Sequence, residues 1–397
     1  MIYQSLEYSS EQDQIKLHTL FNNLLSIADT ESSKQNSIID KIRNLNDEKL
    51  IEDALWDFNA QGIPKIESKY SGPKFHPPYT TAKVSEMMQK FLTGQKMHVR
   101  MLLEILKLSR EALMQRQNIQ HASTSIARKI TVVGDLHGYL EDLSLIFFKN
   151  GFPDVMNPYV FNGDFVDRGP NGVETMCVIL CLFLLNPTSV YLNRGNHEDH
   201  FVNFSYGFIK EINKKYKNHA DHVMKCFADI FRWIPLATII DGKIFVVHGG
   251  ISNRVDLEKL NTLSRRNFVT LLESNQCSEV LKKEEVNNLM DILWSDPRPQ
   301  LGCDNNEFRG GGCYFGPDVT KKFLEKNNFS MIIRSHECKP EGFEYNHDDK
   351  VLTIFSVSNY YSEGSNKGAY LRLRQAMANF QAFSRISIEN SHCITGE

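Results

Sequence analysis

Apolar residues recur at different spacings along the 397-residue chain, and these spacings divide it into regions. Between Thr80, a predicted N-cap, and about position 117, apolar side chains return at helical intervals, as at Val84 and Met88. Gly94 interrupts this pattern, and glycine disfavours the interior of a helix. The spacing therefore predicts two consecutive helices here.

Beyond position 127 the pattern changes to short runs of β-branched and aromatic residues, which are typical of strands. These runs lie at 129–133, 159–161, 189–192, 243–247, 330–333 and 351–357. Apolar stretches with helical spacing separate the first three runs, which predicts βαβ units. The later runs lie closer together, so we expect a mixed sheet or a sandwich.

The flanking segments are more polar. Residues 1–62 carry apolar positions at nearly helical spacing and predict an N-terminal helical extension. Residues 63–78 are rich in proline and glycine and predict a connector. We therefore expect the main domain at 79–385 and a C-terminal tail at 386–397.

Composition narrows the class of protein. Hydrophobic residues make up 41% and charged residues 23%, as in ordinary soluble domains, and the net charge of -3 argues against a nucleic-acid partner. The apolar run at 177–185 is about half the roughly 20 residues needed to cross a bilayer, so we expect a buried helix and no membrane span. The eight cysteines include no CxxC pair, which favours reduced thiols in the cytoplasm or nucleus.

Polar residues that can bind metals follow directly after the predicted strands. The five segments are GDLHG (134–138), NGDFVDRG (162–169), NRGNHE (193–198), HGG (248–250) and RSHE (334–337). In open α/β sheets, sites form beyond the carboxyl ends of the strands. Asp135, Asp164 and Asn196 are spaced at about the length of one βαβ unit, so we expect them at neighbouring strand ends.

Each of these residues has an ordinary structural explanation when taken alone. An aspartate at the end of a strand usually forms a turn, His248 alone would be a core histidine, and Asp167 with Arg168 alone would be an ion pair. All five segments in this order predict a metal site. Carboxylate, amide and imidazole donors without thiolates favour manganese, iron or zinc. Two-metal hydrolases need a bridging ligand, and Asp164 is the candidate.

These motifs resemble the signature of the metal-dependent phosphoprotein phosphatases, the serine/threonine family that includes calcineurin and protein phosphatases 1, 2A and 5. LWSDP (293–297), Arg309–Gly310 and SNYY (358–361) extend the resemblance over about residues 120–375. The downstream segments look most like the EF-hand-containing branch, the relatives of retinal degeneration C phosphatase. The resemblance implies an α/β (α+β) fold, a metallophosphoesterase-like β-sandwich with βαβ units flanked by helices.

The resemblance also implies a role for each matching residue. The implied metal ligands are Asp135, His137 and Asp164 for one ion, and Asp164, Asn196, His248 and His336 for the other. The implied catalytic residues are His197 as general acid, Asp167 orienting it, Arg168 and Arg309 binding phosphate, and Tyr360 lining the site. The predicted reaction is hydrolysis of phosphoserine and phosphothreonine by in-line attack of a hydroxide that bridges two divalent ions. Manganese is the expected metal, with iron and zinc as alternatives.

The expected partners are phosphoprotein substrates, and regulatory proteins are left open. No segment matches D-x-[DN]-x-[DN]-G with a glutamate at position twelve, so EF-hand calcium binding is not expected in this chain. An alternative function is a nucleotide-directed metallophosphoesterase such as a dinucleoside tetraphosphate hydrolase, which shares the first three motifs. LWSDP, Arg309–Gly310 and SNYY argue against it. A third alternative is an inactive scaffold, although no ligand position is lost.

Overall fold

The computed structural model describes residues 63–77, 79–271, 283–374 and 377–383, so the predicted extension at 1–62 and the predicted tail at 386–397 fall outside the described residues. The helices are α4 (Thr81–Leu92), α5 (Val99–Met114), α6 (Leu140–Asn150), α7 (Gly172–Leu185), α8 (His200–Tyr206), α9 (Phe208–Tyr216), α10 (Ala220–Trp233), α11 (Leu257–Thr262), α12 (Lys283–Trp294) and α13 (Pro317–Asn327), with short 3₁₀ turns η1 (Lys217–His219) and η2 (Arg265–Asn267).

The strands form two large sheets and one small one. They are β1 (Ile119–Ala122), β2 (Lys129–Val133), β3 (Tyr159–Phe161), β4 (Val190–Leu192), β5 (Ala237–Ile240), β6 (Ile244–Val247), β7 (Asp296–Pro297), β8 (Cys303–Asn305), β9 (Cys313–Phe315), β10 (Met331–Arg334), β11 (Phe343–Asn346), β12 (Val351–Ile354), β13 (Gly368–Arg374) and β14 (Met377–Phe383). The first sheet has the order β1-β5-β6-β10-β12-β11, the second β14-β13-β2-β3-β4, and the third β7-β9-β8. In the second sheet β2, β3 and β4 are parallel neighbours joined through α6 and α7, which confirms the predicted βαβ units.

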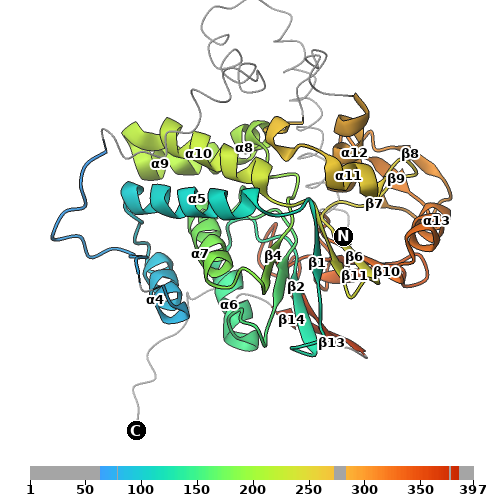
Figure 1. The fold of residues 1–397 in the computed structure, drawn as a ribbon, viewed down its shortest axis with the longest axis horizontal. Helices are drawn as coiled ribbons and strands as arrows, with labels where there is room; N and C mark the ends of the chain where they lie inside the picture. The colour runs from blue at the N-terminus through green and yellow to red at the C-terminus, as the bar shows by residue number, and fades with distance from the viewer. Residues whose placement is uncertain (1–62, 78, 272–282, 375–376, 384–397) are drawn as a thin grey trace, which may run out of the picture.

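The two large sheets pack face to face. One buried cluster draws apolar side chains from both, including Val132 of β2, Val246 of β6 and Leu371 of β13, so the sheets form a sandwich. A second cluster joins the outer face of the second sheet to α4, α5, α6, α7 and α10. A third joins the outer face of the first sheet to α11, α12 and α13. Figure 1 shows these two groups of helices on opposite sides of the strands.

The local signals in the sequence explain several helices. Thr80 caps α4 by accepting a hydrogen bond from the backbone N–H of Lys83, and Gly94, with a φ of 78°, follows the end of that helix. Helix α7 is apolar on all sides, and its residues from Gly172 to Phe183 are buried because it lies between the sheet and other helices. No helix in the described ranges combines the length and apolarity that a membrane span requires.

The six predicted strand runs overlap β2, β3, β4, β6, β10 and β12, and the predicted sandwich is confirmed. The sequence patterns missed β1, β5, β11, β13, β14 and the small sheet. β1 reads IQHA and β13 reads GAYLRLR, and neither contains a run of β-branched residues. Residues 63–77, predicted as a connector, contain neither helix nor strand.

Candidate metal centre

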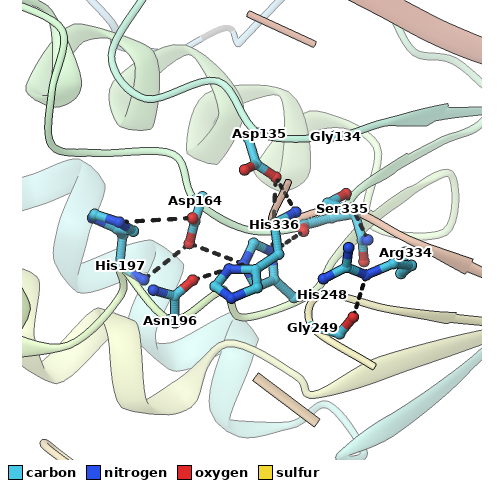
Figure 2. A network of polar contacts seen from close by, with 12 residues as sticks. Gly134, Asp135, Asp164, Asn196, His197, His248, Gly249, Arg334, Ser335 and His336 are labelled. Carbon is cyan, nitrogen blue, oxygen red and sulfur yellow. Dashed lines mark hydrogen bonds and ion pairs between the residues drawn. The ribbon is translucent and has the colours of Figure 1, made fainter. Parts of the chain in front are cut away.

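The predicted donor residues gather at one edge of the sandwich. Asp135, Asp164 and Asn196 follow β2, β3 and β4 of one sheet, and His248 and His336 follow β6 and β10 of the other. Because both sheets end at this edge, turns from five strands converge here, and Figure 2 shows their side chains pointing toward one another. All five of these residues are buried.

Asp164 lies at the centre of the cluster. Its Oδ2 is 3.6 Å from Nε2 of His137, and its Oδ1 is 3.3 Å from Nε2 of His248. The donor atoms of Asp164, His137 and His197 form one group, and those of Asp164, His248 and His336 form a second, each within 4.8 Å. One carboxylate therefore belongs to two potential metal-binding groups, as a bridging ligand must.

Two carboxylates and an imidazole in the cluster lie close enough to shift one another's pKa values. Burial and the neighbouring charge of Asp164 raise the pKa of Asp135 to about 7. Burial opposes ionisation of Asp164 as well, but His248 holds the pKa of Asp164 below its usual range. Although burial lowers it, the Asp164 carboxylate raises the pKa of His248 to about 9. Divalent ions between the two carboxylates would stabilise both in their charged forms.

Asn196 and His336 also fit a metal site. Oδ1 of Asn196 is 2.9 Å from Nε2 of His248, and His248 Nε2 is 3.3 Å from Nδ1 of His336. Reversing the Asn196 amide places its nitrogen near the same imidazoles and Asp164, so polar atoms of three side chains converge on this position. Nε2 of His336 is buried and has no hydrogen-bond partner among the described residues. Converging nitrogen and oxygen atoms of this kind can bind a cation.

The backbone of the site adopts unusual conformations. Five predicted site residues have positive φ: His137 (43°), Asp164 (52°), Asp167 (67°), Arg168 (70°) and His336 (73°). Non-glycine residues rarely occupy this region, and such strain clusters at functional sites. Gly195 has a different reason to be glycine, because a Cβ there would lie 2.3 Å from Oδ1 of Asp164. The turn that contains Gly195 thus lies in close contact with the turn that contains Asp164.

His197 and Asp167 form a hydrogen-bonded pair. Nδ1 of His197 lies 2.9 Å from Oδ2 of Asp167, and Nε2 of His197 lies 4.0 Å from Oδ2 of Asp164. Asn203 Nδ2 and the backbone N–H of Phe208 each donate to Asp167 at 2.8 Å. Burial raises the pKa of Asp167 to about 7 and lowers the pKa of His197 to about 4. Asp167 therefore fixes the orientation of the His197 imidazole through Nδ1, and Nε2 faces the metal centre.

The two arginines are held differently. The exposed Arg168 guanidinium lies over the ring of Tyr206, at 4.1 Å from its centroid. Nε of Arg309 donates to Asp296 at 2.8 Å, and Nη2 of Arg309 lies 3.4 Å from the carbonyl oxygen of His336. Arg309 thus lies beside a predicted ligand, but the carboxylate that orients it was not predicted.

The remaining predicted residue, Tyr360, packs directly on the cluster. Its ring is stacked on that of His137 with centroids 5.3 Å apart and an angle of 24°. Burial raises the pKa of Tyr360 well above its usual value, so its hydroxyl keeps its proton. The structure therefore brings all eleven predicted site residues to one edge of the sandwich.

Sequence reasoning missed the buried carboxylate of Glu198, which ties the motif turns together. Its oxygens accept hydrogen bonds from the backbone N–H groups of Asp164, Phe165 and Gly195, each at 2.8 Å. Glu198 is the last residue of the NRGNHE segment, so its position was in view. Its structural role could not be predicted, because a side chain that accepts hydrogen bonds from backbone N–H groups leaves no pattern in the sequence.

Residues 128–340 match the family described as calcineurin-like phosphoesterase, just over half of the chain. This chain belongs to the calcineurin-like phosphoesterase family. The family and the donor set together imply divalent metal ions at the cluster. A yeast phosphoesterase structure, described as a protein serine/threonine phosphatase from Saccharomyces cerevisiae with similarity to human phosphatase PP5, has a TM-score of 0.68 and 29% identity. The match covers 78% of this chain and 97% of the yeast chain.

Curated relatives of this phosphoesterase confirm the predicted branch. Serine/threonine-protein phosphatase with EF-hands 1 from Mus musculus is 43% identical over 422 residues, which cover 99% of this chain and 64% of the relative. Serine/threonine-protein phosphatase rdgC from Drosophila melanogaster is 40% identical, with coverage of 96% and 56%. The chain thus spans less than two thirds of the length of these relatives.

Proposed function

We propose that this chain is a metal-dependent protein serine/threonine phosphatase that hydrolyses phosphoserine and phosphothreonine. The observation that carries the proposal is the position of Asp164 in two donor groups, one of which includes His197, itself paired with Asp167. Relatives named serine/threonine-protein phosphatases support the substrate class. Phosphoproteins are the proposed partners, together with regulatory proteins, and the proposed location is the cytoplasm or nucleus.

In this proposal the donor cluster holds two divalent ions. The proposed ligands are those that the family resemblance implies: Asp135, His137 and Asp164 for one ion, and Asp164, Asn196, His248 and His336 for the other. We propose manganese, with iron and zinc as alternatives that elemental analysis distinguishes. When bound, such ions lower the pKa of water and neutralise phosphate charge. A nearby cation would offset the burial and the Asp164 charge that raise the pKa of Asp135, and would thus favour its charged form.

His197 is the proposed general acid. A serine or threonine alkoxide is a poor leaving group, so a proton must reach the ester oxygen as the bond to phosphorus breaks. The pair of His197 and Asp167 keeps Nδ1 engaged at 2.9 Å and leaves Nε2 toward the site. An entering phosphate dianion favours the doubly protonated imidazole, which Asp167 stabilises from the other side. The proton then passes from Nε2 to the leaving oxygen.

Arg168 and Arg309 are the proposed phosphate-binding residues. Both guanidiniums present donors in a planar fork that matches phosphate oxygens. Tyr206 supports Arg168 from one face, and Asp296 holds Nε of Arg309 at 2.8 Å, so little conformational entropy is lost when the substrate binds. Tyr360, stacked on His137, closes the apolar side of the site.

The direct test compares substrates with and without added metal. The chain is purified without metal and supplied with manganese, and its turnover is measured on a phosphoserine peptide, an aryl phosphate and a dinucleoside tetraphosphate. We expect metal-dependent release of phosphate from the peptide and the aryl ester, and little from the nucleotide. Preferred cleavage of the nucleotide would overturn the substrate class, and no turnover with any substrate would indicate a binding protein.

A further inference from the structure

Two cysteines face each other on the strands that flank the loop of Arg309. Cys303 begins β8 and Cys313 begins β9, and their Sγ atoms are 2.9 Å apart although both are free thiols. A disulfide has an S–S length of about 2.05 Å, so the two sulfurs need to move about 1 Å closer to bond. Residues 306–312, which include Arg309, form the connection between the two strands.

We propose that Cys303 and Cys313 are a peroxide-sensitive dithiol, and that its oxidation to a disulfide displaces the loop that carries Arg309. The regulatory half of this proposal rests on the proposed phosphate-binding role of Arg309. The chemical half, formation of the bridge, stands independently of any catalytic activity.

The surroundings of the two thiols give them different reactivities. Cys303 is half-buried, and its hydrogen bond with Cys313 lowers the pKa of Cys303 to about 7, with further help from the backbone of Asn253. The same hydrogen bond and burial raise the pKa of Cys313. Cys303 is therefore partly thiolate near neutral pH and accessible, as an attacking thiol must be. Burial raises the pKa of the α7 thiols Cys177 and Cys181, which makes them poor nucleophiles.

The oxidation balances with one molecule of hydrogen peroxide per bridge. The Cys303 thiolate attacks the peroxide oxygen, which forms an S–O bond, breaks the O–O bond and releases water after protonation. The Cys313 sulfur then attacks the sulfur of the resulting sulfenic acid. This step forms the S–S bond, breaks the S–O bond and releases a second water, which takes up the thiol proton of Cys313. A thiol reductant reverses the change by exchange.

Strand register couples the bridge to the Arg309 loop. Cys303 pairs with Phe315 and Cys313 pairs with Asn305, so the cysteines are diagonal neighbours on one face of the hairpin. The Cα atoms of such neighbours are about 7–8 Å apart. A disulfide usually needs a Cα separation of about 4.4–6.8 Å. Closing the bridge therefore draws β8 toward β9.

The residues next to each cysteine hold Arg309 in place. Asn306, directly after β8, donates to Asp296 at 3.0 Å and accepts from the backbone N–H of Arg309 at 3.1 Å. On the other strand, the backbone N–H of Cys313 donates to Ser295, the neighbour of Asp296, at 2.9 Å. A shift of β8 against β9 therefore disturbs both the loop of Arg309 and the carboxylate that orients its guanidinium.

The test begins with the bridge itself. The full chain with a measured metal content is treated with hydrogen peroxide, and the thiols are counted and mapped by mass spectrometry. We expect loss of two thiols and a cross-linked peptide pair joining positions 303 and 313, both reversed by a thiol reductant. Cys303→Ser should form no such bridge, and the control Cys177→Ala, which lacks a core thiol, should form it as the parent does. Absence of the bridge in the parent would overturn the proposal.

The functional effect is measured on the bridged protein. A misplacement of about 1 Å in a positioning group can lower activity by up to about 100-fold, so we expect kcat/KM on a phosphoserine peptide to fall about ten- to hundredfold, mainly through KM. A thiol reductant should restore kcat/KM, and the kcat/KM of Cys303→Ser should not fall on treatment with peroxide. Equal loss of activity in the parent and in Cys303→Ser would point to oxidation of the metals and overturn the coupling.

A reduced chain without any phosphatase activity would overturn the proposed function but not the formation of the bridge. The coupling to Arg309 would then be tested by the affinity for inorganic phosphate, where an unchanged affinity in the bridged chain overturns it.

Discussion

The helical layer of α4, α5, α7 and α10 and the metal centre at the strand ends are both buried, yet their side chains are held in different ways. Most buried side chains of the helical layer are apolar, and Phe231 of α10 packs on Phe227 of the same helix and on Phe208 of α9, with ring centroids 5.8 Å apart. The metal centre consists of buried carboxylates and imidazoles on a backbone with positive φ, as at Asp164 and His336. Apolar burial stabilises without direction, whereas buried like charges and left-handed backbone oppose folding.

This difference separates stability from activity along the same chain. Substitutions in the helical layer should lower the free energy of unfolding and leave each folded molecule active. Substitutions in the metal centre should abolish activity at little cost in stability, or even with a gain, because function there is maintained against local strain. Four substitutions test this contrast, and a fifth measures the contribution of one helix cap.

The largest expected effect is that of Asp164→Asn. Loss of the shared carboxylate should weaken the binding of both ions. Turnover should fall by at least roughly 10⁴-fold, since the ions lower the pKa of water from about 15.7 to about 7. The melting temperature of the metal-free protein should change little, because the lost repulsion between Asp164 and Asp135 is offset by the lost ion pair between Asp164 and His248. Calorimetry and elemental analysis measure both quantities. Asp154→Asn, at an exposed turn, is the matched control, and a melting temperature several degrees lower in Asp164→Asn would contradict the contrast.

His197→Ala should come next. Turnover on a phosphoserine peptide should fall about 10²–10⁴-fold, the range of general acid catalysis, while the metal content stays nearly intact. An aryl phosphate with a good leaving group needs less protonation and should lose less. Asp167→Asn, which keeps the imidazole but alters its hydrogen bond at Nδ1, should have a smaller effect in the same direction. If both substrates lost activity equally, His197 would not act as the acid.

Phe231→Ala probes the helical layer. Removal of this fully buried ring should lower the free energy of unfolding by about 3–5 kcal/mol, while the turnover of the remaining folded protein is unchanged. Urea denaturation measures the first quantity, and activity corrected for the folded fraction measures the second. Phe231→Leu, which leaves a smaller cavity, should lose less stability. A fall in corrected turnover would show that the layer also tunes the site.

Glu198→Gln lies between the two regimes, because Glu198 is buried in the centre but contacts only backbone donors. An amide group must turn its NH₂ toward at least one of these N–H groups, so stability should fall by about 1–3 kcal/mol. The turn of Asp164 should also shift, and metal affinity should fall about 10–100-fold. Metal titration and denaturation of one preparation measure both. Loss of stability alone would show that Glu198 does not position the ligands.

Much of the centre could be predicted because its signals are local. β2, β3 and β4 are short apolar runs, each followed by a polar segment, and parallel neighbours bring Asp135, Asp164 and Asn196 to one edge. The resemblance to the family supplied the remaining residues and their roles, which no periodicity contains. Ten of the eleven predicted site residues lie between positions 135 and 336, and most of them come from strand ends of two different sheets.

What could not be predicted depends on contacts between distant segments. β1 pairs with β5 although IQHA carries no strand signal, so its pairing is decided by the partner strand. Asp296 lies in the LWSDP segment, but its bonds to Arg309 and Arg334 exist only once three loops are assembled. The facing thiols of Cys303 and Cys313 depend on a hairpin whose short strands gave no pattern.

Thr80→Ala should have the smallest effect, and it tests a feature that the sequence predicted correctly. The Thr80 hydroxyl accepts from the backbone N–H of Lys83 at 3.3 Å, and alanine leaves that donor to water. Loss of an N-cap lowers the free energy of unfolding by about 1 kcal/mol. Turnover and metal content should stay the same, because α4 belongs to the helical layer. Thr80→Ser keeps a hydroxyl and should retain most of the stability. If alanine and serine behaved alike, the packing of α4 on α7, rather than its cap, would determine where the helix begins.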